Sequence, residues 1–159
     1  MSHTITISSS LSKEEKYKSL IPQIKSLIED ETDLIANLSN ICAVLKYNMD
    51  FFWVGIYFVK DELIVGPYQG PVACTRIKID EGVCGTAVKE QKTIIVDDVN
   101  KFPGHIACSP DSRSEIVIPI FKNRNIFAVL DIDSDKYSNF DDLDKKYLEM
   151  LAGLISNKI

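Results

Sequence analysis

Three of the four cysteines stand where a thiol can react. Cys74, Cys84 and Cys108 lie beside glycines or in loop-like segments of a chain that we expect to be cytoplasmic. Thiols in that compartment stay reduced, so cysteines in loops indicate catalysis, redox exchange or metal binding more than structural cross-links. The three residues, together with carboxylates further along the chain, therefore indicate redox chemistry on a small polar molecule.

Two of these thiols, Cys84 and Cys108, lie close to the predicted N-terminus of a helix. A short helix over about Gly82 to Glu90 would place Cys84 near free backbone N–H groups, which favour the thiolate. Ser109-Pro110-Asp111 has the form of an N-cap followed by Pro at the first helical position, which predicts the same advantage for Cys108. Cys74 follows a turn rich in Gly and Pro.

Cys42 has a different context. It falls on the apolar stripe of a predicted helix, so we expect a small buried hydrophobe without chemistry.

The candidate acids are constrained by strand parity. Asp131 and Asp133 are two residues apart in one predicted strand, so both side chains leave the same face of the sheet. Glu115 joins them across a hairpin if the connecting loop has an odd number of residues, and we predict the loop Lys122 to Arg124. Like charges and desolvation would then raise at least one pKa and keep a proton available for donation.

Each acid taken alone fits a solvated strand end or a turn. Asp131 is harder to explain in that way, because it follows the apolar run 127–130. A carboxylate in such a strand needs a partner.

Helical periodicity predicts the elements at both ends of the chain. Two amphipathic helices are expected within residues 12–46, separated by the polar break Asp30 to Asp33, and a third over residues 141–157. Ser12 and Glu15 have the spacing of a capping box. Pro22 lies inside the first pattern, so we expect that helix to kink or restart there.

Residues 51–133 are predicted to form the sheet and its functional loops. Aromatic and β-branched runs indicate two hairpins, 51–66 and 114–133, and shorter strands over Ala73 to Ile77 and Ile94 to Asp97. Helices around a mostly antiparallel sheet belong to the α+β class. We expect one domain over residues 1–159, with a flexible tail over 1–11, terminal helices on one face of the sheet and a loop-lined pocket on the other.

Composition narrows the function classes. The chain has 159 residues, 45% of them hydrophobic, and a net charge of -5. That charge, with no basic stripe to offset it, disfavours a nucleic-acid partner and an anionic membrane surface. The polar start lacks the apolar stretch of a secretory signal, so we expect a soluble cytoplasmic protein.

Several motifs resemble those of the free methionine-(R)-sulfoxide reductases, which are single GAF-domain enzymes. The likeness runs from about Glu31 to the C-terminus, in the same order and spacing. The motifs are Phe52-Trp53-Val54-Gly55-Ile56-Tyr57, Gly66-Pro67-Tyr68-Gln69-Gly70, Gly82-Val83-Cys84-Gly85-Thr86-Ala87, Gly104-His105-Ile106-Ala107-Cys108, Ser114-Glu115-Ile116-Val117 and Val129-Leu130-Asp131-Ile132-Asp133-Ser134.

The resemblance implies reduction of free L-methionine-(R)-S-oxide to methionine. In that scheme Cys108 attacks the sulfoxide sulfur and becomes a sulfenic acid, and Cys74 or Cys84 resolves it to a disulfide that thioredoxin reduces. The resemblance also places acids around the substrate's oxygen and ammonium group and two aromatic rings at its methyl-sulfur end. The acids are Glu115, Asp131 and Asp133, and the rings are Trp53 and Tyr57. It further implies a homodimer, with no cofactor and no metal.

Two alternatives stay open. A GAF domain can be a sensor that binds a small ligand without turnover, although three thiols around an acidic pocket favour the enzyme. Cys74, Cys84, Cys108 and His105 could instead hold zinc, but they lack a Cys-x-x-Cys knuckle. Trp53 and Tyr57, which share one strand face, would also serve as core residues.

Overall fold

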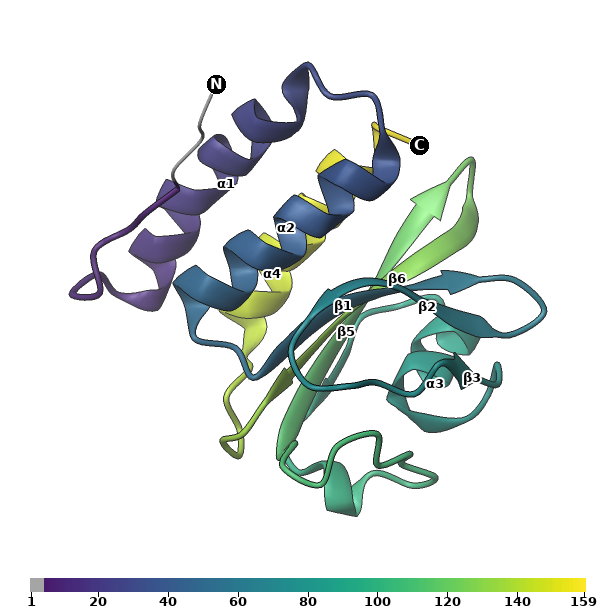
Figure 1. Ribbon diagram of the computed structural model, residues 1–159. Helices are drawn as coiled ribbons and strands as arrows, with labels where there is room; N and C mark the ends of the chain where they lie inside the picture. The colour runs from purple at the N-terminus through teal and green to yellow at the C-terminus, as the bar shows by residue number, and fades with distance from the viewer. Residues whose placement is uncertain (1–4) are drawn as a thin grey trace.

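The computed structural model describes residues 5–159, which form helices on both faces of a single antiparallel sheet (Figure 1). Within that range the sheet has six strands in the order β3-β2-β1-β6-β5-β4. The elements in chain order are α1 (Lys13–Glu29), α2 (Leu34–Met49), β1 (Trp53–Val59), β2 (Leu63–Gln69), β3 (Arg76–Ile77), α3 (Gly82–Glu90), β4 (Ile94–Val96), the 3-10 turn η1 (Val99–Lys101), β5 (Ser114–Lys122), β6 (Asn125–Ser134) and α4 (Asp142–Ser156).

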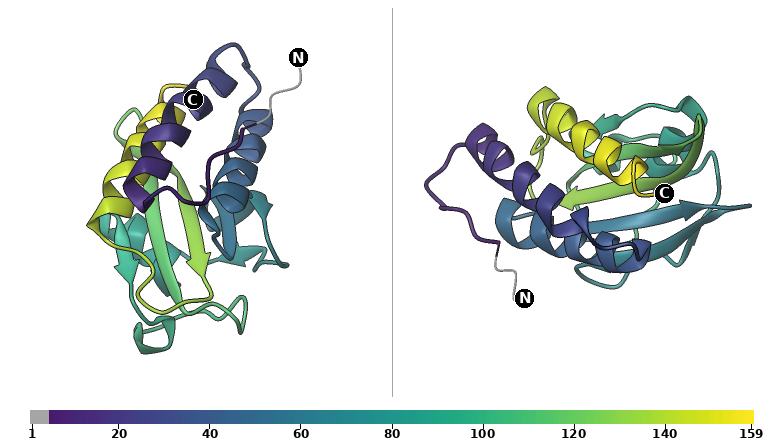
Figure 2. Two further views of the ribbon diagram at one scale, coloured as in Figure 1. Left: turned by 90° about the vertical axis from the view of Figure 1, so that its left-hand side faces the viewer. Right: turned by 90° about the horizontal axis from the view of Figure 1, so that it is seen from above.

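Three helices cover one face of the sheet, as predicted. Helix α2 packs on β1 and β2 and α4 packs on β5, while α1 lies outside them against both helices (Figure 2). The rings of Tyr17 in α1 and Tyr147 in α4 stack with centroids 5.1 Å apart. The expected capping box of Ser12 and Glu15 is present. The predicted restart at Pro22 is wrong, because α1 runs through this residue as one helix.

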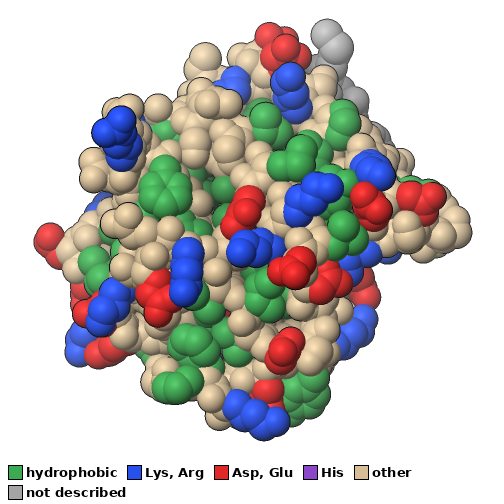
Figure 3. All heavy atoms as spheres, turned by 180° about the vertical axis from the view of Figure 1, so that it is seen from behind, with side chains coloured by type: hydrophobic (Ala, Val, Ile, Leu, Met, Phe, Trp, Pro, Cys, Tyr) green, Lys and Arg blue, Asp and Glu red, His purple; other side chains and the backbone are tan. Residues whose placement is uncertain are grey.

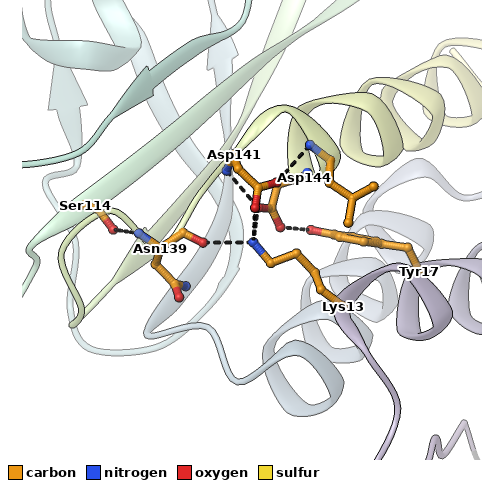
Figure 4. A network of polar contacts seen from close by, with 7 residues as sticks. Lys13, Tyr17, Ser114, Asn139, Asp141 and Asp144 are labelled. Carbon is orange, nitrogen blue, oxygen red and sulfur yellow. Dashed lines mark hydrogen bonds and ion pairs between the residues drawn. The ribbon is translucent and has the colours of Figure 1, made fainter.

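A polar network joins α1 to the start of α4 and to β5 (Figure 4). Lys13 Nζ donates to Asp144 Oδ2 at 2.5 Å, and the Tyr17 hydroxyl donates to Asp144 Oδ1 at 2.7 Å. Lys13 also reaches the backbone carbonyl of Asn139, whose N–H donates to Ser114 Oγ. Because Asp144 is fully buried, these hydrogen bonds replace the contacts with water that its carboxyl group loses on folding. The network fixes the helices relative to Ser114, the neighbour of Glu115.

The hairpin of β5 and β6 has an unexpected turn. Its loop is Asn123-Arg124, two residues with positive φ, so the predicted odd loop over Lys122 to Arg124 is wrong. The register shifts between Ile120 and Phe121, because Phe127 of β6 has no partner and forms a bulge. This extra residue restores the parity, and Glu115 lies opposite Asp133 as the odd loop would have required.

Alternation along β1, β5 and β6 separates the core from the acids. Val54, Ile56, Ile116, Leu130 and Ile132 pack into the helical cluster on one face. Trp53, Tyr57, Val117 and Val129 belong to a second cluster on the other face, which α3 and the long loops cover. Since residues of one parity share a face, Glu115, Asp131 and Asp133 point to the second side.

The short elements of this second side were predicted less well. Helix α3 has the expected bounds and β4 ends one residue early. The strand expected over Ala73 to Ile77 is reduced to Arg76–Ile77. No helix starts at Ser109-Pro110-Asp111, where the described chain makes a turn, so the predicted helix start is wrong, although the Asp111 N–H does donate to Ser109 Oγ.

The tail expected over residues 1–11 lies partly outside the described residues. In the described part, Ile5 and Ile7 pack against the helical cluster. On the face shown in Figure 3, basic and acidic side chains alternate among apolar ones and form no surface of a single sign. No helix between residues 5 and 159 is both long and apolar enough to cross a membrane.

Candidate active site

The second side of the sheet holds a small cavity that collects most of the predicted site residues. Its wall includes seven of them, namely Trp53, Tyr57, Cys84, Cys108, Glu115, Asp131 and Asp133. The eighth, Cys74, reaches the site through a disulfide with Cys108, across a Cα–Cα distance of 5.3 Å. The fold therefore brings all eight residues together, from β1, α3, β5, β6 and two loops.

Trp53 and Tyr57 wall the cavity and also hold the loop that carries Cys74. Trp53 Nε1 donates to the carbonyl of Pro71 at 3.1 Å, and the Tyr57 hydroxyl donates to the carbonyl of Cys74 at 3.0 Å. The indole also stacks on the ring of Tyr68, with centroids 5.3 Å apart. The polar atoms of Trp53 and Tyr57 therefore both have hydrogen-bond partners, as expected for aromatic side chains at the edge of a polar pocket.

Gly55 lets the indole lie flat across β1. A Cβ at this position would lie 2.1 Å from Trp53 Cη2 and 2.7 Å from Tyr68 Cβ, which no side chain tolerates without a shift. The sequence signal for this contact is the spacing of Trp53 and Gly55, which lie two residues apart and so share a strand face. That spacing does not give the orientation of the indole ring.

The acids form a compact cluster on neighbouring strands. Asp133 lies opposite Glu115 on β5 and opposite Trp53 on β1, and Asp131 lies opposite Gly55 and Val117. Carboxylate oxygens of Glu115 and Asp131 and the sulfur of Cys84 all lie within 4.8 Å of one another. Within the described residues, Asp131 Oδ1 is buried without a hydrogen-bond partner.

Burial sets the protonation of this cluster. It raises the pKa of Glu115 well above its ordinary value, and the charge of Asp131 adds to the effect. Burial and the charge of Asp133 likewise raise the pKa of Asp131. Desolvation raises the pKa of Asp133 to about 6, against a hydrogen bond from Ser112 that lowers it. The cluster therefore keeps its protons to higher pH than free carboxyl groups do, which is the direction expected from the sequence.

The cysteines differ more than their sequence contexts suggested. Cys84 does lie in the first turn of α3, but burial first, and then the charges of Asp131 and Glu115, raise the pKa of its thiol. The expected thiolate at Cys84 is therefore wrong, because desolvation outweighs the helix N-terminus. Cys42 is buried with a pKa raised to about 12, as expected for an inert thiol. Cys74 and Cys108 are partly exposed, and Cys108 lies on the cavity wall.

Ser112 is a site residue that the sequence analysis missed. It is buried beside the cavity, and its hydroxyl donates to Asp133 Oδ1 at 2.5 Å. Its only sequence signal is its place between Cys108 and Glu115, and serines in loops are common. His105 also lies on the wall, and burial lowers its pKa, which favours the neutral imidazole near Cys108.

Comparisons with known proteins agree with this geometry. The family model described as GAF domain matches residues 29–159. GAF domain-containing protein A of Dictyostelium discoideum is 55% identical, covering 92% of this chain and 94% of that protein. Free methionine-R-sulfoxide reductase of Saccharomyces cerevisiae is 41% identical, covering 96% and 90%.

A solved structure gives the same relationship in three dimensions. It shows free methionine-R-sulfoxide reductase from Neisseria meningitidis in complex with its substrate. The identity is 46%, the TM-score is 0.94, and the match covers 97% of this chain and 94% of that chain. A cavity that combines a cysteine pair with three acids, and relatives at these identities, lead to one assignment: the chain belongs to the GAF-domain family of free methionine-R-sulfoxide reductases.

Proposed function

We propose that this protein reduces free L-methionine-(R)-S-oxide to L-methionine. One observation carries the proposal: Cys108, which is bonded to Cys74, lies on the wall of a cavity that Glu115, Asp131 and Asp133 also line. A bonded cysteine pair beside carboxyl groups of raised pKa fits a reaction in which a thiol takes the oxygen of a sulfoxide and a nearby acid protonates that oxygen.

In the first step the Cys108 sulfur attacks the sulfoxide sulfur. The sulfoxide oxygen is a poor leaving group until it is protonated, and Glu115 and Asp131, whose pKa values are raised, supply the acid. Oxygen passes to Cys108, which becomes a sulfenic acid as the sulfoxide is reduced by two electrons to the thioether. Methionine then leaves.

In the second step Cys74 attacks the sulfenic acid. The Cys74–Cys108 bond forms and water leaves. We assign Cys74 rather than Cys84 as the main resolving residue, because Cys74 is the partner in the disulfide, whereas Cys84 is a buried thiol with a raised pKa. The bonded sulfurs belong to partly exposed residues, so an external dithiol of the thioredoxin class can reach and reduce them. Such recycling belongs to a reducing cytoplasm.

The cavity favours a free amino acid over a peptide. Within residues 5–159 no Lys or Arg lines its wall, so the acids are free to bind the ammonium group, with Asp133 the most readily ionised of them. The indole of Trp53 suits the polarisable methyl and sulfur. An amide in place of the ammonium would leave the buried carboxylate without its charge partner.

We also propose a homodimer. Ile35 and Tyr47 of α2 are large apolar side chains that remain 51% and 79% exposed in the single chain. Large exposed apolar side chains are often buried in the interface between two copies of a chain. Light scattering at several concentrations tests this part independently of activity.

The test of function is a substrate panel with matched variants. Purified protein with dithiothreitol or thioredoxin should reduce the free R sulfoxide, and should reduce the S epimer and a peptide-bound sulfoxide poorly. Cys108→Ser should abolish turnover, whereas Cys42→Ser, remote from the cavity, should retain it. Binding of the sulfoxide without turnover by the unaltered protein would contradict the proposal and support a sensor.

A further inference from the structure

Three donor groups meet at the base of the cavity, from three different elements. Cys84 comes from α3, Glu115 from β5 and Asp131 from β6, and one ligand atom of each lies within 4.8 Å of the other two. Bonds of about 2.0 to 2.3 Å to a tetrahedral ion require neighbouring ligand atoms about 3.3 to 3.8 Å apart. Small side-chain movements would therefore bring all three donors onto one ion.

The start of α3 holds the sulfur in place for such an ion. Gly85 packs so closely on the preceding turn that a Cβ there would lie 2.7 Å from the carbonyl oxygen of Lys78. Cys84 itself is 2% exposed, so its side chain has little freedom. A donor held by packing loses little entropy when it binds.

A separate observation indicates a missing ligand. Asp131 is only 6% exposed, and its Oδ1 has no hydrogen-bond partner within the described residues. Among the described residues, no Lys or Arg lines the cavity wall to balance the acids. A buried carboxyl oxygen without a hydrogen-bond partner is costly, so this atom is suited to a cation that displaces the carboxyl proton and bonds to the oxygen.

The identity of the donors selects the class of guest. An ammonium group would use the two carboxylates and leave the Cys84 sulfur without a role. One thiolate with two carboxylates suits a borderline-soft divalent ion of the zinc class, whereas magnesium and calcium require more oxygen ligands.

We propose that Cys84, Glu115 and Asp131 form a binding site for a divalent ion of the zinc class, and that the ion and the sulfoxide substrate exclude each other. This site goes beyond the proposed reduction, because metal binding needs neither Cys108 nor turnover. The ion would use the carboxylates that the substrate needs, so the metal acts as an inhibitor rather than as a cofactor. It shares only Cys84 with the zinc site considered from the sequence, which also used Cys74, Cys108 and His105 and none of the acids.

The disulfide form of the protein gives a direct test with Co²⁺ as the probe. The Cys74–Cys108 bond removes two thiols as ligands, which leaves Cys84 and the remote Cys42. We expect one equivalent of Co²⁺ to bind with a thiolate-to-cobalt charge-transfer band in the near ultraviolet, and Zn²⁺ to displace it. Absence of the charge-transfer band would overturn the proposal.

Variants identify the ligands. Cys84→Ser should remove the band and Cys42→Ser should leave it unchanged, and a band that persists in Cys84→Ser would overturn the assignment. Asp131→Asn should weaken Co²⁺ binding about tenfold or more, and equal affinity would remove Asp131 from the site.

Exclusion of the substrate is tested in a protein that cannot turn over. In a Cys74→Ser/Cys108→Ser variant, saturating free methionine sulfoxide should raise the apparent dissociation constant of Co²⁺ about tenfold or more. The same variant should show the charge-transfer band without the sulfoxide. An affinity for Co²⁺ that does not change with sulfoxide would contradict mutual exclusion.

Discussion

Ser112 Oγ donates a hydrogen bond of 2.5 Å to Asp133 Oδ1, which joins the loop after Cys108 to the acidic wall of the cavity. Only Ser109, Pro110 and Asp111 separate this serine from Cys108. The bond therefore couples the position of the proposed nucleophile to the ionisation of Asp133.

Loss of this hydroxyl should change the pH dependence of the reaction. The bond stabilises the carboxylate and lowers the pKa of Asp133, so Ser112→Ala should raise that pKa above about 6. Fewer molecules then carry the Asp133 charge at pH 7, and kcat/KM should fall about tenfold, mainly through KM, with the acidic limb of its pH profile moved to higher pH. Ser39→Ala, on the exposed surface of α2, is the control, and an unmoved profile in Ser112→Ala would refute the coupling.

Loss of Cys74 and loss of Cys84 should have different effects on disulfide formation when the reductant is withheld. After one turnover Cys84→Ser should form the Cys74–Cys108 disulfide, because those two cysteines are already partners. Cys74→Ser should instead accumulate a sulfenic acid at Cys108 that dimedone traps, with disulfide formation slowed about a hundredfold or more by loss of the neighbouring thiol. Mass spectrometry separates the products, and rapid disulfide formation in Cys74→Ser would assign resolution to Cys84.

A methyl group at Gly55 should disturb the aromatic wall. Its Cβ would collide with the indole of Trp53 and with Tyr68, so Gly55→Ala should lower kcat/KM about tenfold and destabilise the fold by about 1 to 3 kcal/mol. Gly153→Ala is the matched control, because nothing lies within 4 Å of that Cβ. In α4 this change should stabilise the protein by about 0.5 to 1 kcal/mol with unchanged activity, and similar kinetics in both variants would contradict the steric account.

The buried acids should reduce stability as the pH rises. Folding raises the pKa of Asp131, so above its unfolded value near 4 the folded protein keeps a proton that the unfolded chain has lost. Stability therefore falls with increasing pH until the folded pKa is passed. Asp131→Asn removes this penalty and should be about 1 to 3 kcal/mol more stable than the unaltered protein at pH 8, with a smaller difference at pH 5.

Urea unfolding of the disulfide forms at both pH values measures this difference. Asp61→Asn, in the exposed turn between β1 and β2, should change little at either pH. An Asp131→Asn variant that is less stable at pH 8 than at pH 5, relative to the unaltered protein, would contradict the sign.

The sequence determined much of the fold because the periodicities are strong. The bounds of α3, the capping box at Ser12 and the shared face of Asp131 and Asp133 follow from local spacing alone. The turn at Asn123-Arg124 shows the limit: a two-residue loop predicts the wrong register, and only the bulge at Phe127 corrects it. A bulge depends on packing against other strands, which no local pattern records.

The site was predicted in its residue types but less well in their environments. Cys84 lies in the first turn of a helix as expected, yet burial, which depends on β5 and β6, raises the pKa of its thiol. The carbonyls that bind Trp53 and Tyr57 lie 18 and 17 residues further along the chain. The disulfide partner of Cys108 likewise depends on how two loops meet.

A single-turnover experiment tests the central claim most directly. Reduced protein, freed of external thiol, is mixed with one equivalent of free L-methionine-(R)-S-oxide and quenched at intervals for mass spectrometry. We expect one methionine per chain, formed no later than the Cys74–Cys108 disulfide, and neither product in Cys108→Ser. Methionine released without oxidation of Cys108, or a disulfide formed at the same rate without sulfoxide, would contradict the account.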